Sequence, residues 1–102
     1  MDKNTIEVNF QEAMASADEL DGIANELERV LKNEYAESQA QLYASWSGAN
    51  ADFYRSKSTK LTEQIQDSVS RIHTAASEIR STARWLRNAE LAALAIAGRR
   101  DY

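Results

Sequence analysis

The first half of the chain carries apolar residues at alternating steps of three and four positions, the spacing of one face of an α-helix. The residues on this face are Phe10, Ala13, Ala17, Leu20, Ala24, Leu27 and Leu31. Met14, Ile23 and Val30 flank the face and widen it beyond the two positions per heptad that a coiled-coil seam needs. The pattern therefore predicts a long amphipathic helix with a broad apolar stripe.

Beyond these seven positions the apolar face moves over by one residue, to Tyr35 and Leu42. Such a drift is expected when a helix of about 3.6 residues per turn is compared with a repeat of about 3.5. We expect this helix to cover about 9–44, with Asn9 as its N-cap. Residues 1–8 are expected to be frayed or extended.

The second half of the chain has a stripe of its own. It consists of Leu61, Ile65, Val69, Ile72, Ala76, Ile79, Ala83, Leu86, Ala93 and Ala97. Small residues accompany it at Ser68, Ala75, Thr82 and Ala89. Large and small side chains in alternation let two helices approach closely. The stripe predicts a helix over about 50–97, with Gly98 as its C-cap.

Between the two stripes the helical spacing breaks around Gly48, which has Ser and Asn close by. We expect a short turn over about 45–49. The predicted fold is all-α: an antiparallel two-helix hairpin that forms one domain, residues 1–102. Because both stripes are wider than one hairpin can cover, two hairpins are expected to dimerise into a four-helix bundle.

The charged side chains are divided unevenly between the two helices. Residues 1–44 hold ten acidic and three basic side chains, and residues 45–102 hold six acidic and nine basic ones. Two helices of opposite charge attract one another along their flanks. The net charge of −4 argues against a general nucleic-acid binder. No apolar run is long enough for stable membrane insertion, and the N-terminus lacks the pattern of a secretory signal peptide.

Catalytic and metal chemistry have little support in this chain. It has no Cys, and His73 is its one His, placed beside the apolar stripe. Neither a Gly-x-Ser-x-Gly nucleophile motif nor a Gly-rich phosphate loop occurs. We therefore expect no enzyme activity, no metal ion and no cofactor.

Four aromatic residues cluster around the turn: Tyr43, Trp46, Phe53 and Tyr54. They could form a small apolar cap over the end of the hairpin, or a recognition surface for a partner. A buried indole removes about 150–250 Å² from water, so a Trp in a turn needs a place to insert. We expect the ring of Trp46 to lie in a groove between helices, across the dimer.

A chain of this length, with two long helices and Trp46-Ser47-Gly48 in the turn, resembles the Trp-X-Gly (WXG) family. These are small type VII (ESX-type) secretion proteins, the early-secreted-antigen-like helical hairpins. The resemblance implies a secreted protein, exported without a cleaved signal peptide by a machine driven by an ATPase. It also implies a homodimer or a heterodimer with a related hairpin. On this basis Trp46, Gly48, Tyr43, Phe53 and Tyr54 are the expected partner-binding residues.

The family's usual Tyr-xxx-Asp/Glu export motif is not matched after the second helix, since Tyr102 is the last residue. A related pattern in the family has an apolar residue, an acid four positions on, and apolar residues three and seven positions beyond the acid. Leu86, Glu90, Ala93 and Ala97 match this spacing and form the candidate export signal.

Two functions follow from the resemblance. The first is a secreted substrate that acts as an effector or as a co-secretion partner. The alternative is a cytoplasmic adaptor or targeting chaperone that binds a helical segment of a larger toxin. Purification with or without a bound partner would separate them.

Overall fold

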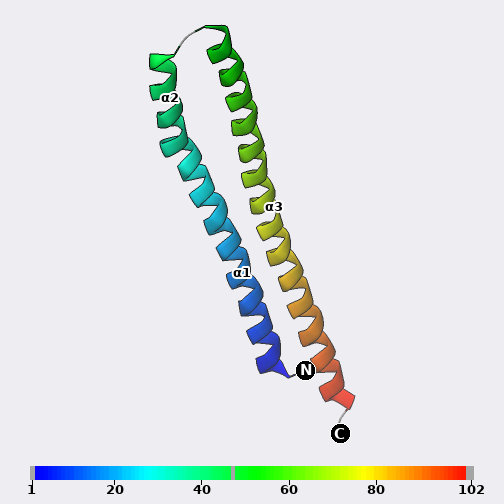
Figure 1. The fold of residues 1–102 in the computed structure, drawn as a ribbon. Helices are drawn as coiled ribbons and strands as arrows, with labels where there is room; N and C mark the ends of the chain where they lie inside the picture. The colour runs from blue at the N-terminus through cyan, green and yellow to red at the C-terminus, as the bar shows by residue number, and fades with distance from the viewer. Residues whose placement is uncertain (1, 47, 101–102) are drawn as a thin grey trace. The chain divides into compact units, whose positions relative to one another are not determined.

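The computed structural model describes residues 2–46 and 48–100, and among these only Asp2, Trp46 and Gly48 lie outside a helix. Helix α1 covers Lys3–Arg29, a π-helix η1 covers Val30–Tyr35, and helix α2 covers Ala36–Ser45. Helix α3, Ala49–Arg100, follows the turn (Figure 1). The predicted all-α hairpin is confirmed: α1, η1 and α2 form the first arm, and α3 forms the second. Ser47 of the turn and Tyr102 lie outside the described residues.

The first helix begins at Lys3, so the expectation that residues 1–8 are frayed or extended was wrong for residues 3–8. Oδ1 of Asp2 accepts a hydrogen bond of 2.7 Å from the backbone N–H of Thr5, which caps the helix. This bond also lowers the pKa of Asp2. Asn9, the predicted N-cap, lies inside α1. The earlier start allows Ile6 to be buried, with 2% of its surface exposed.

The shift of the apolar face after Leu31 has a different cause from the drift that the sequence indicated. Val30–Tyr35 form a π-helix, in which the backbone bonds run from i to i+5 and one additional residue is accommodated. The inner face therefore continues through Tyr35, Gln39 and Leu42, which are all half-buried. A local change of helix type keeps these side chains turned inward.

The turn depends on Gly48, whose φ of +106° is rarely adopted by residues with a side chain. Its carbonyl accepts a 3.0 Å hydrogen bond from the backbone N–H of Asp52, in the first turn of α3. Gly98, in contrast, lies inside α3, which continues to Arg100. The prediction that Gly98 caps this helix was wrong, because its backbone does not turn out of the helix.

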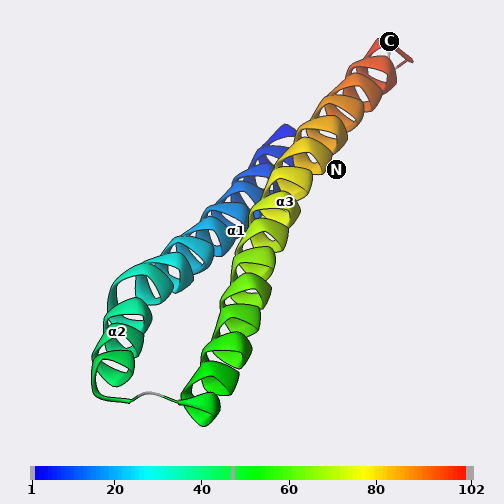
Figure 2. The same cartoon turned by 90° about the horizontal axis from the view of Figure 1, so that it is seen from above.

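Contacts within the chain divide it into two compact units, which we describe separately. The terminal unit comprises 1–21 and 74–102, where the start of α1 lies beside the C-terminal part of α3 (Figure 2). The turn unit comprises 22–73, where η1 and α2 lie beside the first part of α3.

The buried core of both units is built mainly from small residues. In the terminal unit it consists of Ile6, Ala17, Ala76 and Ala83, and in the turn unit of Ala24, Leu31, Ala51, Ser58 and Val69. Small side chains let the backbones of two helices come close together. The second stripe was predicted correctly at Val69, Ala76 and Ala83, but Leu61 and Leu86 are exposed. One hairpin covers only a narrow strip of this stripe.

Candidate partner-binding surfaces

Trp46 lies at the end of α2 and contacts the start of α3. Its ring centroid is 5.7 Å from that of Tyr54, with the two planes tilted by 56°. Trp46 is nevertheless 37% exposed, so it is not buried between the helices of its own chain. Burial across a dimer stays a prediction.

Tyr43 is held by a residue that the sequence reasoning missed. The guanidinium of Arg55 lies 4.7 Å from the centroid of the Tyr43 ring, and its Nη2 donates a 3.4 Å hydrogen bond to the carbonyl of Tyr43. Arg55 also pairs with Asp52 at 3.3 Å. Arg55 follows Tyr54 directly in the sequence, so a cation next to the aromatic cluster was the available signal.

Phe53 is 66% exposed and contacts the Nζ of Lys57, 5.4 Å from the ring centroid. The four aromatic residues therefore do not form a single apolar cap. Tyr43 faces the helix pair, Trp46 lies against Tyr54, and Phe53 is turned to the surface. The exposed rings are available to a partner.

A polar layer joins η1 and α2 to α3 inside the turn unit. The hydroxyls of Tyr35 and Ser58 are 2.7 Å apart and hydrogen-bonded, and Ser58 is buried. The Oε1 of Gln39 and the hydroxyl of Tyr43 are also buried, but neither has a hydrogen-bond partner among the described residues. A buried polar atom left in this way costs about 1–3 kcal/mol. The packing of this region is therefore weaker than an apolar interface of equal size.

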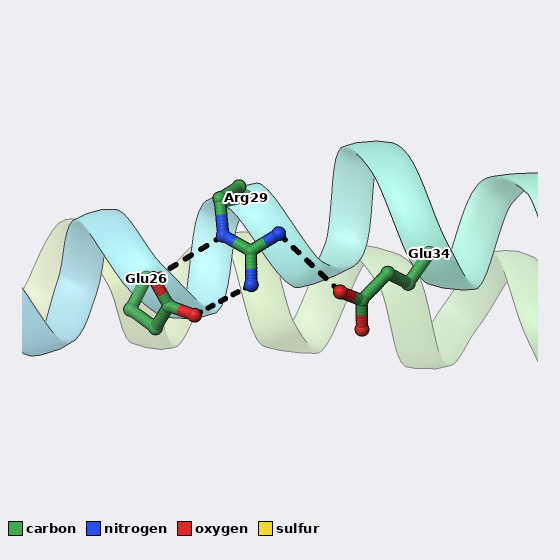
Figure 3. A network of polar contacts seen from close by, with 3 residues as sticks. All are labelled: Glu26, Arg29 and Glu34. Carbon is green, nitrogen blue, oxygen red and sulfur yellow. Dashed lines mark hydrogen bonds and ion pairs between the residues drawn. The ribbon is translucent and has the colours of Figure 1, made fainter.

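On the outer side of the π-helix, Arg29 connects two carboxylates (Figure 3). Its Nη2 is 2.6 Å from Oε1 of Glu26, and its Nη1 is 3.3 Å from Oε1 of Glu34. The hydrogen bond from Arg29 lowers the pKa of Glu26, and the same pair raises the pKa of Arg29. The step of five residues from Arg29 to Glu34 suits a π-helix, because in an α-helix those positions point in different directions.

One flank of the terminal unit is closed by ion pairs between the two arms. Nη2 of Arg80 lies 2.7 Å from Oδ1 of Asp18 and 2.6 Å from Oδ2 of Asp21. Arg87 binds Glu7, with 2.8 Å between Nη2 and Oε1. The hydrogen bonds that both arginines donate to these carboxylates raise the pKa values of Arg80 and Arg87. The predicted attraction between an acidic first arm and a basic second arm is confirmed for these residues.

The other flank of the terminal unit is apolar. Ile79 and Leu86 each precede one of the paired arginines by one residue, so they are turned from it by about 100° around the helix. An open groove of about 440 Å³ lies here, lined by Ala13, Ala75, Glu78, Ile79, Thr82, Ala83 and Leu86. A second hollow of about 160 Å³ shares Ala13, Ala83 and Leu86 with it and reaches Glu90. We call the larger hollow the apolar groove; it leaves Ile79 and Leu86 accessible from outside the helix pair.

The sequence was compared with models of known protein families. A family model described as "Proteins of 100 residues with WXG" matches residues 5–91. The chain belongs to the WXG100 family. WXG100 proteins are small helical proteins of type VII secretion that typically form hairpin dimers, and the family is not known for enzymatic activity. Comparison with curated proteins and with solved structures gave no match.

The candidate export residues of this WXG100 chain lie next to the apolar groove. Leu86 and Glu90 line the hollow beside Phe10, and Glu90 is half-buried. Ala93 and Ala97 follow on the exposed surface of α3. The four positions share one side of the helix, because their steps of four, three and four residues keep to a single face.

Metal sites and membrane-spanning helices are two further classes of feature. Within residues 2–46 and 48–100, no group of three or more His, Cys, Asp or Glu side chains is placed to hold a metal ion. No helix in the same described part of the chain is long and apolar enough to span a membrane.

Proposed function

We propose that this chain is a substrate of a bacterial type VII secretion system, exported as a dimer of hairpins that acts as an effector or a co-secretion partner. The family match supports the secretion route. The observation that carries the dimer is the apolar groove of the terminal unit, which stays open in the described part of the chain.

The groove suits a second hairpin better than a small ligand. It is open and elongated along α3, and it combines large side chains at Ile79 and Leu86 with small ones at Ala75 and Thr82. A facing helix with the same alternation can interdigitate with it. The opposite flank is already occupied by ion pairs of Arg80 and Arg87, so a second copy of the chain is expected on the apolar side.

The test of this dimer places a charge in the groove. In Ala75→Glu a carboxylate replaces a half-buried methyl group, and we expect the chain to elute as a folded monomer. Ser81→Glu, a control at an exposed position of the same helix, should remain a dimer. The measurement is mass by light scattering at micromolar concentration, with circular dichroism to check folding. A folded wild-type monomer would contradict the homodimer, and recovery of a dimer only on co-expression with a related hairpin would assign a heterodimer.

The export signal is proposed at Leu86, Glu90, Ala93 and Ala97, as a face that docks on the export ATPase. Leu86 also lines the apolar groove, so changing it would affect the proposed dimer as well. Glu90 does not line that groove and is therefore the position to change. Glu90→Ala and deletion of 91–102 should both retain the chain in the cell while leaving it dimeric. Glu63→Ala, at an exposed acid on the same helix, is the control and should be secreted normally.

The result also distinguishes a substrate from an adaptor for a larger toxin. A substrate appears in the medium, and its loss from the medium follows the Glu90 change. An adaptor stays in the cell in every variant and co-purifies with a helical segment of the toxin. Normal secretion of the truncated chain would place the signal elsewhere, at the turn around Trp46.

A further inference from the structure

Between the π-helix and the turn, the two arms are joined by small and polar side chains. On α3 the buried positions in this stretch are Ala51 and Ser58. On the other arm Tyr35 reaches Ser58 through its hydroxyl at 2.7 Å, and Tyr43 contacts Arg55. Little large aliphatic surface leaves water when this stretch closes, so the hydrophobic stabilisation of the closed form is small.

Two polar atoms on the same face favour an open form. Tyr35, Gln39 and Tyr43 are four residues apart, so they form one column along η1 and α2. The Oε1 of Gln39 and the hydroxyl of Tyr43 are buried without a hydrogen-bond partner in the described part of the chain. Separation of the arms gives both atoms access to bulk water, which compensates for part of the contact that is lost.

The π-helix supplies a place where the first arm can bend. π-Helical turns are rare, and they interrupt the regular ladder of i to i+4 hydrogen bonds. Here η1 lies directly before α2, and on its outer side the exposed Arg29 and Glu34 are paired across five residues. That pair keeps the two ends of the π-helix together without attaching α2 to α3.

We propose that α2 is a locally opening segment, which separates from α3 by bending at η1 while the helix pair of the terminal unit stays closed. Opening hydrates Gln39 and Tyr43 and uncovers Ser58. Such sub-global opening is expected where buried apolar contacts are few. The fold thus has a segment beside the turn that can open without a change in the apolar groove of the terminal unit.

Native-state hydrogen exchange of the full chain tests this proposal. Backbone amides of 36–45 should exchange at least roughly tenfold faster than those of 10–21 in the terminal unit. Their exchange rates should depend little on denaturant concentration, because a local opening exposes little surface. Fraying of a helix end could also speed exchange, so a variant must decide. In the double variant Gln39→Leu and Tyr43→Phe both partnerless polar atoms are removed, and exchange of 36–45 should slow by roughly tenfold.

Gln41→Leu is the matched control, because Gln41 lies on the exposed side of α2 and the same chemical change should leave exchange there within about twofold. Ser58→Ala, which removes the partner of Tyr35, should speed exchange of 36–45 and leave 10–21 unchanged. The proposal is overturned if the double variant does not slow exchange in 36–45. Equal slowing throughout the chain would overturn it as well.

Discussion

Arg87 donates hydrogen bonds to both carboxylate oxygens of Glu7, although the two residues are 80 positions apart in the sequence. Nη2 is 2.8 Å from Oε1, and Nε is 3.1 Å from Oε2. The same guanidinium lies 5.0 Å from the centroid of the Phe10 ring. A bidentate pair of this kind has one favoured geometry, so it sets the register of α1 against α3 in the terminal unit.

This pair predicts a pH dependence of stability. The hydrogen bond from Arg87 lowers the pKa of Glu7 in the folded chain. The stabilisation of the folded chain by the Glu7–Arg87 pair is therefore complete above the ordinary pKa of a glutamate, about 4.3. It is lost as the pH falls through the lower pKa that Glu7 has in the folded state. Glu7→Gln should melt at a lower temperature at pH 7 and show a weaker dependence on acid. Thermal melts between neutral and acidic pH at low salt measure this.

Glu12→Gln is the control for that experiment, because Glu12 is exposed and forms no ion pair with the other described residues. It should retain the acid dependence of the wild type. High salt should reduce the difference between wild type and Glu7→Gln, because the pair is partly exposed. An unchanged acid dependence in Glu7→Gln would show that other carboxylates control it.

The π-helix predicts an unusual tolerance to a deletion. Without the exposed Asn33, the segment can close as a regular α-helix that still presents Tyr35, Gln39 and Leu42 on its inner face. We expect the deletion variant to remain helical and to melt at the wild-type temperature or above it. Circular dichroism and thermal melts measure both.

Deletion of the exposed Glu19, inside the regular helix α1, is the matched control. It turns the residues before it by about 100° relative to those after it, so Ile6 and Phe10 leave their contacts. We expect its melting temperature to fall by more than about 10 °C. If the Asn33 deletion is as damaging as this control, the π-helix does not hold an additional residue.

Gly48 and Gly22 should respond in opposite directions to substitution by Ala. At Gly48 an added methyl group meets open space, but φ is +106°, so Ala should lower the free energy of unfolding by about 1–2 kcal/mol. At Gly22, exposed inside α1, Ala should raise it by up to about 1 kcal/mol. Urea denaturation measures both, and a neutral Gly48→Ala would show a different turn conformation in solution.

Fluorescence quenching tests whether a dimer buries Trp46. In Trp85→Phe the indole of Trp46 is the single one left, and it is 37% exposed in one chain. Quenching of Trp46 fluorescence by acrylamide should decrease as the protein concentration is raised across the range in which the dimer forms. The control is Trp46→Phe, which retains Trp85, 68% exposed on α3, and should show no such change. Full quenching of Trp46 in the dimer would leave its ring free to contact the secretion machine.

The sequence alone determined the helices, the position of the turn and the centre of the core. Ala17, Ala24, Val69 and Ala76 recur at helical spacing and are buried as predicted. This was readable because the periodicity of a helix depends on neighbours only three or four residues away. The turn at Gly48 was equally local, since a positive φ selects Gly.

Only the tertiary structure decided where these helices end and which side chains the second arm covers. The sequence pattern predicts an extended segment at Ile6, whereas the structure buries this residue, because its burial depends on contacts with a distant part of α3. The pairing of Tyr35 with Ser58 and the exposure of Trp46 and Leu86 also depend on how the arms meet. Helical spacing states which side chains share a face, whereas burial depends on the register and width of the surface that packs against it.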